Sequence, residues 1–386
     1  MTASSPAAIP APAGPWLFSR TIDLWTFGGS AALSLLLLAI GWRLGILHSD
    51  SPEWTWIACV LLVDVAHVYA TGFRVYFDRD ELRRRPGLYY GVPLAAFGLG
   101  WAVHSESPAM YWRLLAYLAV LHFIRQQYGW VMLYRARAGE TDTWGRRLDA
   151  ATIYIATLHP LACWHASLPR RFDWLIAGDF AALPAWAADV TDVLWAGLLP
   201  AYFLRSLVRG VRFRFWNPGK DLVVATTALL WYLGIVVLNS DFAFTVTNVL
   251  IHGIPYLVLL YLYWTRSTSG QGRSVWSSAI IFLSTVWLLA YVEELLWDRG
   301  VWREREHLFT RQAVGNPGGV LAPLLGVPQL THYILDGFLW KRRTNRRFND
   351  EFAAPDEGFA SRLSRDASMA TAAELPHAGS SSRDDR

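Results

Sequence analysis

Cysteine is scarce in this chain of 386 residues, which contains only Cys59 and Cys163. Both lie within apolar runs, so the sequence offers neither a disulfide framework nor a cysteine-ligated zinc or iron–sulfur site. Charged residues are also few. They make up 17% of the chain, whereas a typical soluble domain has about 25%, and this low charge indicates that lipid is the main solvent.

Several common sequence patterns are missing. Residues 1–14 lack the basic and apolar regions of a cleaved signal peptide, so the first apolar helix is expected to be retained. The net charge is only +4, and the arginines cluster beside apolar runs, which argues against nucleic acid as a partner. We find no HExxH, GxSxG, GxGxxG, phosphate-binding loop or desaturase-type histidine boxes. Protease, lipase and nucleotide-driven pump functions are therefore disfavoured.

Apolar residues are abundant, at 53% of the chain, and 21 tryptophans and 16 tyrosines accompany them. A helix that crosses a bilayer needs roughly 17 to 25 mostly apolar residues. The sequence predicts an all-α, polytopic transmembrane bundle of about ten spans, at 24–47, 54–77, 88–104, 109–134, 149–166, 187–208, 221–239, 242–265, 275–296 and 319–341.

The loops predict an orientation for this bundle, because cytoplasmic loops carry excess lysine and arginine. Basic clusters follow the even-numbered spans, and they include Arg79, Arg83, Arg84, Arg85, Arg135, Arg137, Arg146, Arg147, Arg205, Arg209, Arg212, Arg214, Lys220, Arg266, Arg273, Lys341, Arg342, Arg343, Arg346 and Arg347. We interpret them as topology signals. Both termini are then cytoplasmic, in a bacterial inner membrane. The polar ends, 1–20 and 346–386, are predicted to be disordered around a transmembrane domain at 21–345.

Four histidines lie within even-numbered spans, namely His67, His122, His252 and His332. At a rise of 1.5 Å per residue, their distances from the span ends place all four near one depth, close to the middle of the bilayer. An ionisable group inside hydrocarbon is costly and is therefore a functional candidate. A single buried histidine can equally serve helix packing alone, but four at one depth favour a shared site.

Each of these histidines has a polar neighbour three or four residues away, on the same helix face. These neighbours are Asp64, Gln126, Asn248 and Asp336. Metal-bound imidazoles usually donate their second N–H to such a partner, so Asp64, Gln126 and Asp336 are candidate catalytic or orienting residues. An all-imidazole site with carboxylate support suits iron, copper or zinc, and we favour iron as Fe²⁺.

Other polar residues receive simpler interpretations. Glu293 and Glu294 lie at the outer end of the ninth span and are interpreted as a solvated rim. Tyr69, Tyr128 and Tyr333 lie close to the histidines, and packing is the expected role of such aromatic rings.

Four short segments resemble one known family. They are "DVAHVYA" around His67, "LHFIRQQ" around His122, "VLIHGIPY" around His252 and "THYILDGF" around His332. This pattern is similar to the Brp/Blh family of integral-membrane β-carotene 15,15'-dioxygenases. Where that family has a further histidine, four residues after the third, this sequence has Tyr256. The resemblance implies a non-haem iron held by histidines from different transmembrane helices, and cleavage of a carotenoid to retinal.

The predicted function is that of a membrane-embedded, metal-dependent oxygenase or oxidoreductase acting on a lipid-soluble substrate such as a carotenoid, another isoprenoid or an acyl chain. Two alternatives remain open. The histidines could pair as axial ligands of haem in an electron carrier, or the polar groups could form the ion or proton site of a transporter.

Overall fold

Helices account for all regular secondary structure in the described part of the protein. The structure is a computed structural model that describes residues 14–266, 273–309 and 319–341, together with Asn345, Phe348, Asn349 and Phe352. No strand occurs within these residues. The predicted all-α fold is therefore confirmed. Several predicted loop arginines, among them Arg342, Arg343, Arg346 and Arg347, lie outside the described residues.

Each predicted span coincides with one or more helical segments, of which η1 to η5 are π-helical. In chain order they are α1 (Arg20–Asp23), η1 (Leu24–Gly29), α2 (Ser30–Leu44), α3 (Glu53–Thr55), η2 (Trp56–Val65), α4 (Ala66–Arg74), α5 (Arg79–Arg84), α6 (Pro86–Glu106), α7 (Pro108–Arg137), α8 (Thr143–Ala166), α9 (Ala185–Phe213), α10 (Pro218–Trp231), η3 (Tyr232–Val237), α11 (Asp241–Phe244), η4 (Thr245–Val249), α12 (Leu250–Thr265), α13 (Val275–Trp297), η5 (Asp298–Trp302), α14 (Glu306–Phe309), α15 (Leu321–Leu325) and α16 (Val327–Leu339). The last predicted span, 319–341, is interrupted at Gly326 between α15 and α16.

Six of these segments are long and apolar enough to cross a membrane. They are Arg20–Leu44, Glu53–Arg74, Ala185–Phe213, Pro218–Val237, Asp241–Thr265 and Val275–Trp302. This finding indicates a multi-pass membrane protein.

Local sequence signals explain where several long helices begin. Ser107 and Asn217 each precede a proline and cap the next helix, because their side chains accept N–H groups of Met110 and Lys220. Asp142 caps α8 in the same way, through the N–H of Gly145. Polar caps followed by proline therefore define the start of α7 and of α10.

The ordered bundle extends beyond its predicted ends. Leu17 and Phe18 fall in the segment predicted to be disordered, yet both are buried, and their N–H groups donate to the carboxylate of Asp23. Phe352, from the predicted C-terminal tail, is also buried and contacts the ring of Phe18 at 5.8 Å. Apolar side chains from beyond both predicted boundaries, at 20 and 346, thus pack on the bundle. Residues 1–13 and most of 346–386 lie outside the described residues.

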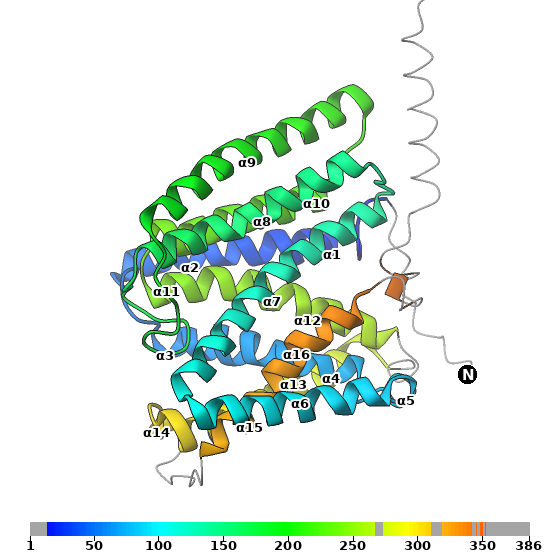
Figure 1. Cartoon of the computed structure of the whole chain (residues 1–386). Helices are drawn as coiled ribbons and strands as arrows, with labels where there is room; N and C mark the ends of the chain where they lie inside the picture. Colours follow the sequence, from blue (N-terminus) through cyan, green and yellow to red (C-terminus); the bar gives the residue numbers. More distant parts are fainter. Residues whose placement is uncertain are drawn as a thin grey trace, which may run out of the picture.

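The helices differ strongly in how much neighbouring protein covers them. Figure 1 shows α9 at one edge of the bundle and α6 near the opposite edge, with α12 between them. The most apolar part of Asp241–Thr265, which contains α12, is 83% buried, whereas that of α9 is only 11% buried. α9 packs mainly on α8 and exposes apolar side chains such as Val193, Leu204 and Val211. α12 is thus the central helix, and α9 has the surface expected for contact with lipid.

Charged side chains hold together one end of α7, α8, α9 and α10. This ionic clamp consists of Arg135, Glu140, Asp149, Arg205, Arg209 and Lys220. The ammonium of Lys220 donates to both oxygens of Glu140 at 2.8 and 2.9 Å, and to Asp149 at 2.9 Å. Arg135 and Lys220 are each only 3% exposed. These two predicted loop charges are therefore structural groups as well.

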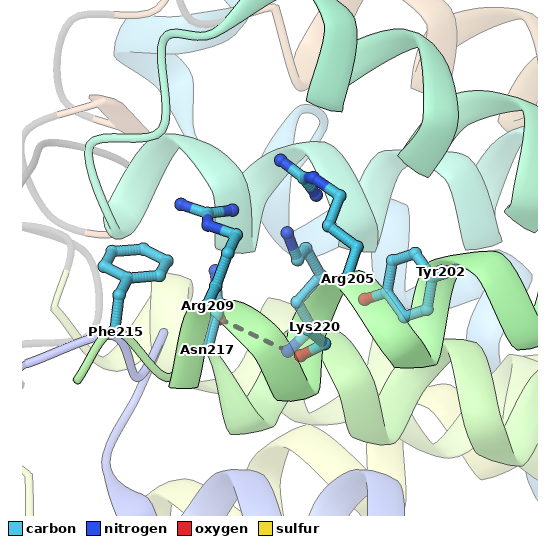
Figure 2. Close-up of a pocket in the computed structure, with 7 residues that line it drawn as sticks. Tyr202, Arg205, Arg209, Phe215, Asn217 and Lys220 are labelled. Atoms are coloured by element: carbon cyan, nitrogen blue, oxygen red, sulfur yellow. Dashed lines mark hydrogen bonds between the residues drawn. The ribbon is translucent and has the colours of Figure 1, made fainter. Parts of the chain in front are cut away.

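A small opening lies beside the clamp, and Figure 2 shows the side chains that line it. Arg209 donates to Glu140 at 2.6 Å, and Arg205 pairs with Asp149 at 3.2 Å. Since the three cationic groups of this opening already pair with carboxylates, we interpret it as part of the clamp.

The clamp predicts a pH-dependent stability. Burial alone would raise the pKa of the Glu140 carboxyl, but Lys220 and Arg209 outweigh it and lower the pKa from 4.5 to about 2. The unfolded chain therefore binds a proton more readily than the folded chain. The stabilisation is complete above about pH 5 and is lost as the pH falls toward 2.

We expect Glu140→Gln to lower the free energy of unfolding at pH 6 by about 1 to 3 kcal/mol, because it removes the carboxylate that pairs with Arg209 and one of the two that pair with the buried Lys220. The difference from wild type should shrink as the pH is lowered from 5 to 3. Thermal unfolding in detergent at several pH values measures both effects. A difference that is independent of pH would contradict this account of Glu140.

Candidate metal centre

Four histidines from four helices meet at one point in the bundle. This histidine cluster consists of His67 on α4, His122 on α7, His252 on α12 and His332 on α16. The Nε2 atoms of His67 and His252 are 3.1 Å apart, as are those of His122 and His332. One potential ligand atom from each of His67, His122 and His252 lies within 4.8 Å of the other two. The four histidines, which the sequence places near one depth, thus come together, and none is more than 6% exposed.

Wide helical turns precede two of these histidines. The π-helix η2 ends two residues before His67, and η4 ends three residues before His252. A π-helical turn changes which side chains share a helix face, and such turns are frequent at functional sites. They direct the following side chain toward the cluster.

Gly253 allows His67 and His252 to approach each other. A Cβ atom on Gly253 would lie 2.6 Å from Cγ1 of Val63 and 3.2 Å from the Val63 carbonyl oxygen. α12 therefore packs against η2 at a distance that only glycine permits. This contact places His252 beside His67.

The break at Gly326 allows α16 to form a separate helix. α16 begins at Val327–Pro328, with proline at its start, and packs against α4, α6 and α7. Its mid-helix residue His332 then reaches His122 on α7.

The polar neighbours of the cluster fall into two groups. Asp64 and Asp336 lie close to imidazoles, as predicted: Asp64 Oδ1 is 3.6 Å from Nδ1 of His67, and Asp336 lies 3.9 Å from Nδ1 of both His122 and His332. These distances exceed a direct hydrogen bond. The carboxylates therefore surround the cluster without a direct hydrogen bond to it.

The other two expected partners face elsewhere. Gln126 donates to the backbone carbonyl of His252 at 2.7 Å, and Asn248 donates to Thr247 at 3.0 Å. Within the described residues, neither side chain bonds the histidine on its own helix face. Asn248 lies in the π-helical η4, where the usual four-residue alignment does not hold, while Gln126 finds a carbonyl acceptor on α12.

Sequence reasoning missed the closest polar contact of the cluster. Thr71 Oγ1 lies 2.8 Å from Nδ1 of His332, although 261 positions separate them in the sequence. Thr71 follows His67 by four residues on α4, and this same-face spacing was the available signal. A threonine is a common helix residue, so the spacing alone did not single it out.

Aromatic rings fix the orientation of two imidazoles. Phe123 stacks on His252 with ring centroids 3.6 Å apart and an interplanar angle of 8°, and Tyr333 stacks on His122 at 4.8 Å and 26°. These aromatic side chains do more than fill space. They limit the rotation of the rings whose nitrogens meet.

Glu293 differs from its predicted role as part of a solvated rim. Glu293 is only 3% exposed. Its carboxylate accepts a hydrogen bond from Trp297 Nε1 at 3.0 Å, and Gln329 Nε2 lies 3.5 Å from the same oxygen. The interpretation as a water-exposed group is wrong, because α15 packs against α13 and Gln329 of α16 reaches the Glu293 carboxylate.

The donor set fits a metal ion. Metal–nitrogen bonds of about 2.0 to 2.1 Å place adjacent imidazole nitrogens roughly 2.8 to 3.4 Å apart, for right-angled and tetrahedral arrangements. The two separations of 3.1 Å agree with this range. Within the described residues, Nδ1 of His67 and of His252 have no hydrogen-bond partner. Burying four imidazoles against one another is costly, and a shared cation would offset that cost.

Comparison with protein-family models, with curated proteins and with solved structures gives no match for this chain.

The contact at Gly253 leads to a test of how the cluster is assembled. We expect Gly253→Ala to lower stability by about 1 to 3 kcal/mol through steric overlap with Val63, although alanine is the better helix former. The matched control is Gly129→Ala on α7, where a Cβ atom meets nothing within 4 Å. Thermal unfolding in detergent compares the two variants. Equal stability would show that α12 and η2 have room to separate.

Proposed function

We propose that the protein is an integral-membrane, metal-dependent oxidoreductase, and specifically a non-haem iron oxygenase that acts on a lipid-soluble substrate. The observation that carries the proposal is the convergence of four buried imidazoles from four helices, with Nε2 atoms 3.1 Å apart in two pairs. Asp336 adds one carboxylate beside His122 and His332.

The donor chemistry supports a redox-active metal, and we propose iron. Imidazole ligands without thiolate suit iron, copper and zinc, and among these, iron and copper are redox-active. A bound Fe²⁺ would supply activation of O₂ at this site. The protein contributes geometry, because stacked rings orient the imidazoles, and a buried position that excludes bulk water.

The surroundings of the site support an apolar substrate. The cluster lies within the helical bundle, whose outer surfaces are rich in apolar side chains. A carotenoid, another isoprenoid or an acyl chain could reach it from the lipid phase, and the resemblance to the Brp/Blh dioxygenases favours a carotenoid. We further propose ten crossing segments with both termini cytoplasmic, in a bacterial inner membrane. α16 has 13 residues and spans only about 20 Å, so α15 would complete the tenth crossing.

The separations of the nitrogen atoms argue against haem as the cofactor. Two axial imidazoles lie on opposite sides of one haem iron, with nitrogens about 4 Å apart. The pairs in this cluster are closer, at 3.1 Å, and the other two imidazoles occupy the space beside each pair. Direct coordination of a single ion is the better explanation.

Transport is a second candidate function, because one observation favours it. The break at Gly326 divides the last predicted span into α15 and α16, and His332 lies on the second of these. Discontinuous helices near a buried polar site are typical of secondary transporters.

We expect near-stoichiometric iron in freshly purified wild-type protein, without the Soret absorption band of haem. His122→Ala and His332→Ala should lose most of the iron, because each removes a ligand. His159→Ala is the control, since His159 is equally buried but pairs with Thr191 on α9, outside the cluster. Elemental analysis and absorption spectroscopy in detergent measure the result. Wild-type protein that holds no metal would overturn the oxygenase proposal and favour transport.

Activity provides the next test. With Fe²⁺ bound, wild-type protein should consume O₂ in the presence of β-carotene and form a shorter aldehyde, detected by chromatography, and His332→Ala should lose this activity. If O₂ consumption depends on another lipophilic compound, the carotenoid is the wrong substrate within the same function. If no lipophilic compound supports it in the iron-loaded protein, oxygenase activity is refuted.

A further inference from the structure

We propose that Thr71, Tyr256 and Asp336 form a directional hydrogen-bond chain that fixes the tautomer of His332, so that its Nε2 lone pair faces the other imidazoles. Thr71 and Tyr256 are then positioning residues for a ligand nitrogen. The tautomer follows from the hydrogen bonds alone, whereas the role in metal binding rests on the proposed function.

The chain of contacts is short and buried. Tyr256 donates to Asp336 Oδ1 at 2.6 Å, Thr71 Oγ1 lies 3.1 Å from the Tyr256 hydroxyl, and Thr71 Oγ1 lies 2.8 Å from Nδ1 of His332. Thr71 is 4% exposed, and Tyr256 and His332 are each 1% exposed. Bulk water therefore cannot replace Thr71 or Tyr256 as a partner, while Asp336, at the outer end of the chain of contacts, is 11% exposed.

The direction of each bond follows from the number of hydrogens available. Trp340 Nε1 can only donate, and it donates to Asp336 Oδ1 at 3.1 Å, so this oxygen acts as an acceptor. The single hydrogen of the Tyr256 hydroxyl therefore goes to Asp336. In its contact with Thr71, the Tyr256 oxygen can then only accept.

The remaining steps follow in the same way. Thr71 uses its single hydroxyl hydrogen to donate to Tyr256, so its oxygen accepts from His332. Nδ1 of His332 must carry the hydrogen. In a neutral imidazole, Nε2 then has a free lone pair, and this atom lies 3.1 Å from Nε2 of His122.

His332 is the one member of the cluster with such a chain in the described part of the protein. The nearest carboxylates lie 3.6 Å from Nδ1 of His67 and 3.9 Å from Nδ1 of His122. Nδ1 of His252 has no hydrogen-bond partner there. The tautomer of His332, and with it the free lone pair on Nε2, is thus fixed before any metal binds. α4 supplies both His67 and the Thr71 hydroxyl that orients His332.

The first test reads the tautomer directly in metal-free, full-length protein with ¹⁵N-labelled histidine in detergent. Nuclear magnetic resonance distinguishes protonated from unprotonated ring nitrogens, and the His332 signals are assigned by their loss in His332→Ala. We expect Nδ1–H and unprotonated Nε2 in wild type. A protonated Nε2 would overturn the proposal whether or not the protein binds metal.

Three variants test the chain itself. Thr71→Val keeps the shape of the side chain but removes the acceptor, so hydrogen should shift to Nε2, where it can donate to His122. Tyr256→Phe frees the Thr71 hydroxyl to donate to Nδ1 and should cause the same shift. Thr71→Ser retains the hydroxyl and should keep the wild-type tautomer. An unchanged tautomer in both Thr71→Val and Tyr256→Phe would overturn the proposal.

Metal affinity tests the positioning role. We expect Thr71→Val and Tyr256→Phe to weaken Fe²⁺ binding by about 10- to 100-fold, as is usual when the partner of a ligating histidine is removed, and Thr71→Ser to restore it. Anaerobic titration of the purified protein with Fe²⁺ measures the dissociation constants. If the tautomer shifts as expected but wild type binds no iron, the chain stands and the proposed function fails. If wild type binds iron and all three variants bind it equally well, the positioning role is wrong.

Discussion

The burial of four imidazoles in an apolar bundle is the constraint that shapes the centre of this protein. A polar ring inside such a bundle is costly unless it has a partner, and here the nearest partners are the other rings. The central helices are built to allow this meeting. Gly253 brings α12 against η2, π-helical turns precede His67 and His252, and the break at Gly326 separates α16 from α15.

Two buried polar groupings in the same fold differ in how their members are paired. In the ionic clamp, each cation has a carboxylate partner, and the clamp joins the ends of four helices. In the histidine cluster, nitrogen faces nitrogen, and two ring atoms have no partner among the described residues. Closed ion pairs contribute to stability and leave nothing for a ligand. Imidazole nitrogens gathered in this way are suited to bind a metal ion.

The surroundings of the cluster show how several helices cooperate in setting one side chain. The orientation of His332 depends on a threonine from α4, a tyrosine from α12, and an aspartate from its own helix. The aspartate in turn accepts from Trp340. A hydrogen-bond chain with a donor-only group at one end has one allowed direction. It therefore transmits a choice of tautomer between atoms that do not touch.

The amino-acid sequence alone was sufficient to predict the helical segments and to single out the four histidines by their shared depth. Runs of apolar residues define helices locally, and the shared depth of the histidines follows from the constant rise of a helix. Helical spacing correctly indicated that Asp64 and Asp336 lie next to a histidine of the cluster. It failed for Gln126 and Asn248, because helix rotation and a π-helical turn decided where those side chains point.

Only the tertiary structure decided which residues meet. The contact between Thr71 and His332 spans 261 positions, and that between Thr71 and Tyr256 spans 185. The burial of Glu293 and of Phe352 depends likewise on segments distant in the sequence. Hydropathy and helical spacing are properties of one segment at a time. The rotation of each helix and its close approach to a neighbour arise only when all segments pack together, and these determine the partners of the histidine cluster.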